Sequence, residues 1–145
     1  MKVLFLDIDG VVNRATTTQV HRGFLGIDPL LAGFVRRIKE DTGCELVLSS
    51  TWRQVVDGRA EVDRKVAKTY DETPSLESGI RGDEIQAWLD AHPEVTRYAI
   101  VDDIDSWFHE GQPVFKTETM TGLTPQTVRE ITAYLNGADE AGGAC

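Results

Sequence analysis

The sequence predicts an α/β fold in which helices cover both faces of a mainly parallel sheet. Short apolar runs alternate with helical patterns along the chain, as expected for parallel strands joined by crossover helices. Three of the apolar runs end in polar residues: Asp7 with Asp9, Ser49 with Ser50, and Asp102 with Asp103. Ligands of parallel sheets bind beyond the carboxyl ends of the strands, so these residues define a candidate site.

The elements of the first half follow from local patterns. Residues 2–8 form a continuous apolar run and are expected to be a buried strand. The polar, Thr-rich segment 13–26 is expected to be a loop or flap. Asp28 is placed as the N-cap of a helix that Gly43 ends. Residues 44–50 are again apolar and predict the second strand.

The second half predicts two further strands and three helices, and its patterns are weaker. In chain order we expect a partly exposed helix over residues 54–70, a loop over 71–79, a helix over 83–91, a strand over 97–101, a weaker strand over 113–119, and a last helix that Thr124 caps and Asn136 ends. A single domain over residues 1–137 and a flexible tail over 138–145 account for the whole chain.

Composition limits the class of protein. Of the 145 residues, 41% are hydrophobic and 27% are charged, which is ordinary for a soluble globular domain. A net charge of −9 argues against a passive, non-specific nucleic-acid binder. We expect no targeting signal or membrane span, and no disulfide between Cys44 and Cys145, so a reducing cytoplasm fits.

Asp7 and Asp9 carry the strongest chemical information. Strand alternation places both side chains on one face, and Gly10 lets the backbone turn just past the strand. Two carboxylates at the mouth of a sheet suit a hard divalent cation or phosphoryl chemistry. The alternative, a pair of strand-end turn residues, would leave an unpaired carboxylate pair beside a buried strand, which is costly.

In these motifs the chain resembles the haloacid dehalogenase (HAD) superfamily of phosphohydrolases. Its four motifs correspond, in the right order, to Leu6-Asp7-Ile8-Asp9-Gly10, to Leu46-Val47-Leu48-Ser49, to Arg81, and to Ala99-Ile100-Val101-Asp102-Asp103. The resemblance implies a three-layer, Rossmann-like fold.

The resemblance also implies roles for the acidic residues. Asp7 would be the nucleophile that forms an aspartyl-phosphate, and Asp9 would be the general acid and base. Mg²⁺ would be held by the Asp7 carboxylate, the Asp9 main-chain carbonyl and Asp102. Asp103 would bind the ion through water or orient its ligands.

The phosphoryl group needs donors that neutralise its oxygens. Four side chains are candidates to hold it: Ser49, Ser50, Arg53 and Arg81. Lys65 and Lys68 compete with Arg81 for the role of the third motif, but they fall on what the pattern predicts to be a solvated helix face.

A closer resemblance links the chain to phosphatase domains of bacterial and phage RNA-repair proteins, which are similar to the 3′-phosphatase half of polynucleotide kinase-phosphatase. It rests on Leu48-Ser49-Ser50-Thr51-Trp52-Arg53, on the helix over residues 85–89 and on Thr121-Gly122-Leu123-Thr124. It implies a Mg²⁺-dependent phosphomonoesterase that acts on the 3′-phosphate ends of RNA or DNA.

The substrate stays open at the level of sequence. Residues 13–28 and 54–79 are the only candidates for a cap, and both are too short for a full cap domain. A minimal or absent cap leaves an open site, which suits a nucleic-acid end, whereas the acidic net charge favours a smaller partner. The alternatives are a small-molecule phosphatase for nucleotides or sugar phosphates, and a phosphate-binding domain without turnover.

Overall fold

In the computed structural model, which describes residues 1–138, five parallel strands form one sheet in the order β5-β4-β1-β6-β7. The strands are β1 (Lys2–Leu6), β4 (Glu45–Leu48), β5 (Asp71–Glu72), β6 (Arg97–Asp102) and β7 (Val114–Lys116). The first strand in the sequence is therefore the central strand of the sheet. The predicted α/β class with a mainly parallel sheet is confirmed.

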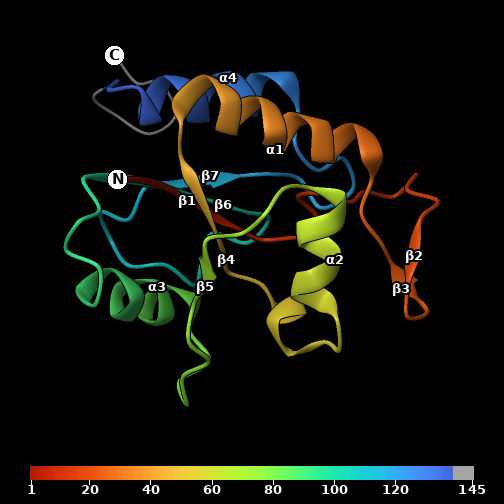
Figure 1. Ribbon diagram of the computed structural model, residues 1–145, viewed down its shortest axis with the longest axis horizontal. Helices are drawn as coiled ribbons and strands as arrows, with labels where there is room; N and C mark the ends of the chain where they lie inside the picture. Colours follow the sequence, from red (N-terminus) through yellow and green to blue (C-terminus); the bar gives the residue numbers. More distant parts are fainter. Residues whose placement is uncertain (139–145) are drawn as a thin grey trace.

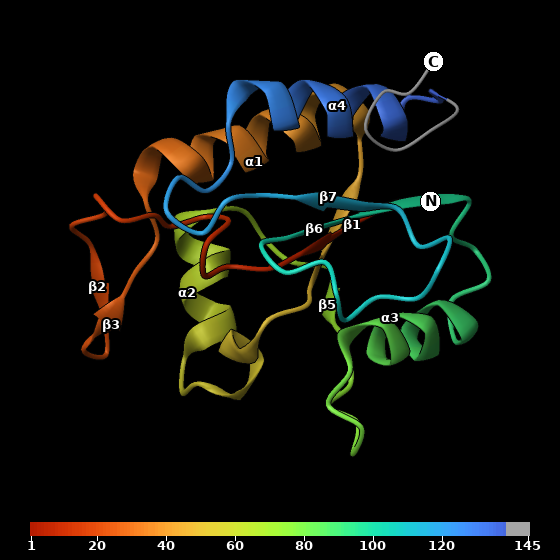
Figure 2. The same ribbon diagram turned by 180° about the vertical axis from the view of Figure 1, so that it is seen from behind.

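Helices cover both faces of this sheet and make three layers. Figures 1 and 2 show α1 (Pro29–Thr42) and α4 (Pro125–Leu135) side by side on one face, with α3 (Arg81–Asp90) on the other. The short helix α2 (Gly58–Lys65) stands at one end of the sheet. Beyond it lies a separate hairpin formed by β2 (Val20–His21) and β3 (Phe24–Leu25).

Strand alternation in β1 divides the core between the two faces. Leu4 and Leu6 belong to the cluster that packs under α1 and α4. Val3 and Phe5 point to the opposite side, where Phe5 meets Trp88 of α3 edge-to-face at 5.5 Å between ring centroids. Both faces of β1 are buried, as its unbroken apolar run predicts.

Helix α1 has the boundaries that its sequence predicts. The side chain of Asp28 accepts hydrogen bonds from the backbone amides of Leu30 and Leu31. Gly43 ends the helix in the left-handed region, with φ of 71°. Asp28 also accepts from Arg14 and Thr17, at 2.9 Å each, so the cap ties the preceding loop to the helix.

The structure corrects three local expectations. The expected loop over residues 71–79 contains β5, the expected long helix over 54–70 is only α2, and the segment 13–26 holds the β2–β3 hairpin. The strands β2, β3 and β5 have two residues each, and strands this short are set by their pairing partners rather than by their own residues. The tail predicted over residues 138–145 lies outside the described residues apart from Ala138.

Within residues 1–138, no helix is both long and apolar enough to cross a membrane.

Candidate active site

The carboxyl ends of three adjacent central strands converge on one edge of the sheet. The amide of Asp7, just past β1, donates to the carbonyl of Val101 in β6 at 3.1 Å. The amide of Ser49, just past β4, donates to the carbonyl of Leu6 at 2.8 Å. Asp102 is the last residue of β6. The parallel pairing thus brings together Asp7, Ser49 and Asp102, which lie far apart in the sequence.

Asp7, Asp102 and Asp103 form an acidic cluster at this edge. One carboxylate oxygen from each lies within 4.8 Å of those of the other two. Asp7 and Asp102 are buried, with 2% and 1% of their surfaces exposed. Burial, and then the charge of Asp102, raises the pKa of Asp7 well above its usual value. Burial likewise raises the pKa of Asp102.

This cluster fits a hard divalent cation. Three carboxylates at such spacing match the oxygen ligands that Mg²⁺ takes in proteins. Burying like charges together is costly unless a cation compensates them. The donor set is all oxygen and contains neither Cys nor His, which suits Mg²⁺ better than a thiophilic metal.

Arg81 supplies a positive charge to the same cluster. Its Nη1 lies 3.1 Å from Asp7 Oδ1 and 2.5 Å from Asp102 Oδ2, and its side chain is only 11% exposed. The helix α3 begins at this residue, two positions earlier than the pattern predicts, which places Arg81 at the end of α3 nearest the cluster. Lys65 and Lys68 are exposed and form no ion pair with the cluster among residues 1–138.

Asp9 stands beside the cluster and is exposed, unlike Asp7. Its Oδ1 accepts hydrogen bonds from Asn13 Nδ2 at 2.9 Å and from the indole Nε1 of Trp52 at 3.2 Å. The Oδ1 of Asn13 in turn accepts from the amide of Gly10 at 2.9 Å. Two donors from different segments therefore fix the orientation of the Asp9 carboxylate.

Gly10 makes the turn that separates Asp9 from the flap. Its φ of 78° is one that side-chain-bearing residues rarely adopt, and a Cβ at this position would lie 2.2 Å from Asp103 Oδ2. Asp103 Oδ2 also accepts from Thr119 Oγ1 at 2.8 Å. Thr117 donates to the Gly10 carbonyl at 2.7 Å. The segment after β7 thereby braces the acidic cluster.

The two serines after β4 differ in their contacts. The hydroxyl of Ser49 is buried and has no hydrogen-bond partner within residues 1–138. The hydroxyl of Ser50 accepts from the amide of Trp52 at 3.2 Å and caps the short 3-10 helix η1 (Thr51–Gln54). A buried hydroxyl without a partner costs free energy, so Ser49 is the serine available to a ligand.

Arg53 lines a pocket together with Arg81, but most of its N–H donors are already bonded within the protein. Its Nε donates to the Ser50 carbonyl at 2.8 Å, and its Nη2 lies 3.1 Å from Glu84 Oε1 in a buried ion pair. Its Nη1 donates to Thr73 and Pro74. These contacts brace η1 against α3, and they leave few donors of Arg53 for a phosphate.

Three contributors were not expected from the sequence: Asn13, Trp52 and Thr119. Asn13 and Trp52 reach Asp9 from the start of the flap and from η1, and Thr119 reaches Asp103 from beyond β7. The rule that polar residues at strand ends gather could have found Thr119. Nothing in the local sequence distinguishes Trp52 from a packing residue, and in the structure its surface is only 5% exposed.

The sequence comparisons agree with this geometry. The family described as "HAD domain in Swiss Army Knife RNA repair proteins" matches residues 3–128. This match includes the three strand ends that form the site and every residue of the site. No curated protein and no solved structure matches the chain.

Proposed function

Because the chain belongs to the family of HAD domains in Swiss Army Knife RNA repair proteins, we propose that it is a Mg²⁺-dependent phosphomonoesterase for nucleic-acid 3′-phosphate ends. The observation that carries the proposal is the contact of Arg81 with both Asp7 and Asp102. A nucleophilic carboxylate, a metal-ligating carboxylate and a phosphate-binding cation would have to meet in this way.

We assign the chemical steps to Asp7 and Asp9. Asp7 attacks phosphorus, and the bond from phosphorus to the leaving oxygen breaks as the aspartyl-phosphate forms. Asp9 gives its proton to that oxygen, and then accepts one from the water that hydrolyses the aspartyl-phosphate. The fixed Oδ1 of Asp9 leaves Oδ2 as the oxygen that carries this proton.

The phosphoryl oxygens need positive charge and donors as the transition state forms. We propose that Arg81 and the hydroxyl of Ser49 supply them from the protein. Asp7, Asp102 and the main-chain carbonyl of Asp9 would hold Mg²⁺, with Asp103 orienting them. When bound, Mg²⁺ supplies the charge that lets a carboxylate approach a phosphate dianion. The contacts of Arg53 and Ser50 favour a bracing task over phosphate binding.

The test of the assignment is the variant Asp7→Asn. We expect it to fold normally and to lose turnover of a 3′-phosphorylated oligonucleotide by on the order of 10³-fold or more, because an amide is a poor nucleophile. Asp105→Asn is the matched control, since Asp105 is exposed and lies just past the cluster. EDTA should stop the reaction of the parent protein and Mg²⁺ should restore it.

The substrate is tested by comparison. A 3′-phosphorylated oligonucleotide, a 5′-phosphorylated one and a set of mononucleotides and sugar phosphates are assayed with the same enzyme. The 3′-end should give the highest kcat/KM. Equal or faster hydrolysis of the small substrates would contradict the repair function and favour a small-molecule phosphatase. Retained activity in Asp7→Asn would contradict the assignment of Asp7 as the nucleophile.

A further inference from the structure

A small pocket lies beside the acid/base residue, between the β2–β3 hairpin and η1. Its volume is about 230 Å³, and it is lined by Asp9, His21, Phe24, Thr51, Trp52 and Val55. Asp9 is the one lining residue that belongs to the proposed catalytic pair. Whatever occupies this pocket therefore contacts the carboxyl group that would protonate the leaving oxygen.

The hairpin presents two rings to this pocket. His21 and Phe24 are directly paired across β2 and β3, so their side chains lie on the same face of the hairpin. His21 stacks on the indole of Trp52, with 5.2 Å between ring centroids and 20° between planes. Phe24 is 74% exposed. A ring so exposed, next to the acid/base, is available for stacking by a ligand.

One ion pair and one close polar contact join the hairpin to α2 and to the residue before it. Arg22 Nη2 lies 2.6 Å from Asp57 Oδ2, and His21 Nδ1 lies 3.7 Å from Glu61 Oε2. Arg22 and Asp57 both have positive φ, of 52° and 61°. Side-chain-bearing residues rarely adopt this conformation, and the Arg22–Asp57 pair joins the two residues that do so here.

From this arrangement we propose that the pocket binds the terminal nucleobase of a single-stranded 3′-phosphorylated end, with the base stacked on Phe24. The inference rests on the proposed function and specifies its substrate. Stacking on an aromatic ring accepts every base, because each has a π-face. A base within a duplex is already stacked, so a single-stranded end is the form that fits.

A second pocket shares Asp9 and Phe24 but opens toward Met120 and has a volume of about 300 Å³. The two are separable by variants. Val55 lines only the first pocket and Met120 only the second. We place the base in the first because the rings of His21 and Trp52 line that pocket and not the second.

The experiment compares kcat/KM for two 3′-phosphorylated oligonucleotides that differ only in the last nucleotide, which either carries its base or is abasic. We expect the parent protein to prefer the complete substrate by about tenfold, in line with the contribution of one stacked base. In Phe24→Ala this ratio should fall toward one, and in Phe24→Tyr it should be retained. Val55→Ala should lower it, and Met120→Ala should not.

Val20→Ala is the matched control, because Val20 is 68% exposed on the same hairpin and lines neither pocket. Equal rates with both substrates in the parent protein, or an unchanged ratio in Phe24→Ala, would contradict the proposed binding of the base in this pocket. Neither result would contradict the proposed phosphatase activity. If neither substrate is hydrolysed, the proposed function fails. The same two oligonucleotides, labelled at the 5′ end, are then compared by fluorescence anisotropy, and equal dissociation constants would overturn the pocket as well.

Discussion

At the residue scale, the position of Arg81 shows how the site depends on a single helix boundary. The sequence favoured Arg81 for the third motif and kept Lys65 and Lys68 as rivals on an expected solvated helix face. The structure places Arg81 against Asp7 and Asp102 because α3 starts at that residue. The start of a helix that lacks a side-chain N-cap has little local signature, so this choice depended on tertiary structure.

Alanine variants of Gly10 and Gly23 distinguish the effect of a steric clash with Asp103 from the effect of backbone strain alone. Both have positive φ, but a Cβ on Gly10 would meet Asp103 whereas a Cβ on Gly23 would meet nothing within 4 Å. We expect both alanine variants to lose about 1 kcal/mol of unfolding free energy from strain. Only Gly10→Ala should also displace Asp103 and weaken Mg²⁺ binding. Isothermal titration of the two variants measures this, and equal affinities would contradict the prediction.

At the scale of elements, the entry to α1 couples the flap to the core through one carboxylate. Asp28 caps α1 and also pairs with Arg14 of the flap. The sequence predicts the cap, because Asp28 precedes a proline and an apolar helix face. Nothing in the local sequence predicts the pair between Asp28 and Arg14. The β2–β3 hairpin and β5 were missed for the same reason, since their short strands depend on partners elsewhere in the chain.

Asp28 gives a pH-dependent prediction. Burial by itself would raise the pKa of Asp28, but hydrogen bonds from Arg14, Thr17 and the amides of Leu30 and Leu31 lower it below the usual value. Ionised Asp28 therefore stabilises the fold above the ordinary carboxyl pKa of about 3.9, and this contribution is lost as pH falls through the lower pKa of the folded state.

Two variants separate the two tasks of Asp28. At pH 7, Asp28→Ala should lose about 1 kcal/mol more than Asp28→Asn, because asparagine still caps the helix. The difference between the parent protein and Asp28→Asn should shrink as the solution is made acidic. Urea unfolding across this pH range provides the measurement. A difference that stays constant with pH would show that the Arg14 pair contributes nothing.

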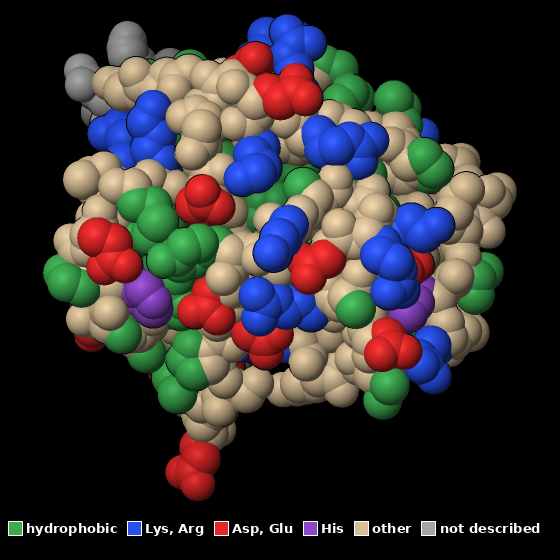
Figure 3. Space-filling model, viewed as in Figure 1, with side chains coloured by type: hydrophobic (Ala, Val, Ile, Leu, Met, Phe, Trp, Pro, Cys, Tyr) green, Lys and Arg blue, Asp and Glu red, His purple; other side chains and the backbone are tan. Residues whose placement is uncertain are grey.

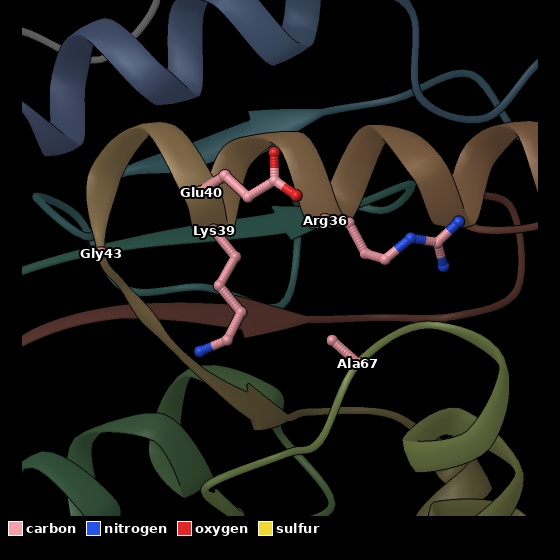
Figure 4. A pocket seen from close by; sticks show the side chains of 5 residues that line it. All are labelled: Arg36, Lys39, Glu40, Gly43 and Ala67. Atoms are coloured by element: carbon pink, nitrogen blue, oxygen red, sulfur yellow. The ribbon is translucent and has the colours of Figure 1, made fainter.

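At the scale of the whole molecule, charge is unevenly distributed. The net charge is −9, yet Figure 3 shows Lys and Arg side chains gathered on the face that carries α1 and α2. A pocket of about 410 Å³ on this face is lined by Arg36, Lys39, Glu40, Gly43 and Ala67 (Figure 4). No residue of the candidate site lines it. Two acidic residues of the candidate site, Asp7 and Asp102, are instead buried at the sheet edge.

Binding of a cation at that edge should stabilise the fold as a whole. A ligand that binds only the folded state raises its stability, by about 2.7 kcal/mol at a concentration one hundred times the dissociation constant. Adding Mg²⁺ should therefore raise the Tm of the parent protein, and Asp102→Asn should remove most of the shift. NaCl at equal ionic strength is the control. A shift of the same size with NaCl, or in Asp102→Asn, would indicate general screening.

The place of β1 in the sheet has a consequence for the timescales on which the molecule moves. Its amides are bonded between β4 and β6 and covered on both faces, so their hydrogen exchange should require opening of the whole domain. The β2–β3 hairpin rests on two-residue strands and one exposed ion pair, and its amides should exchange through small, frequent openings. Asp7 would then keep its place through every fluctuation short of unfolding, while the hairpin that lines the pocket beside Asp9 moves many times.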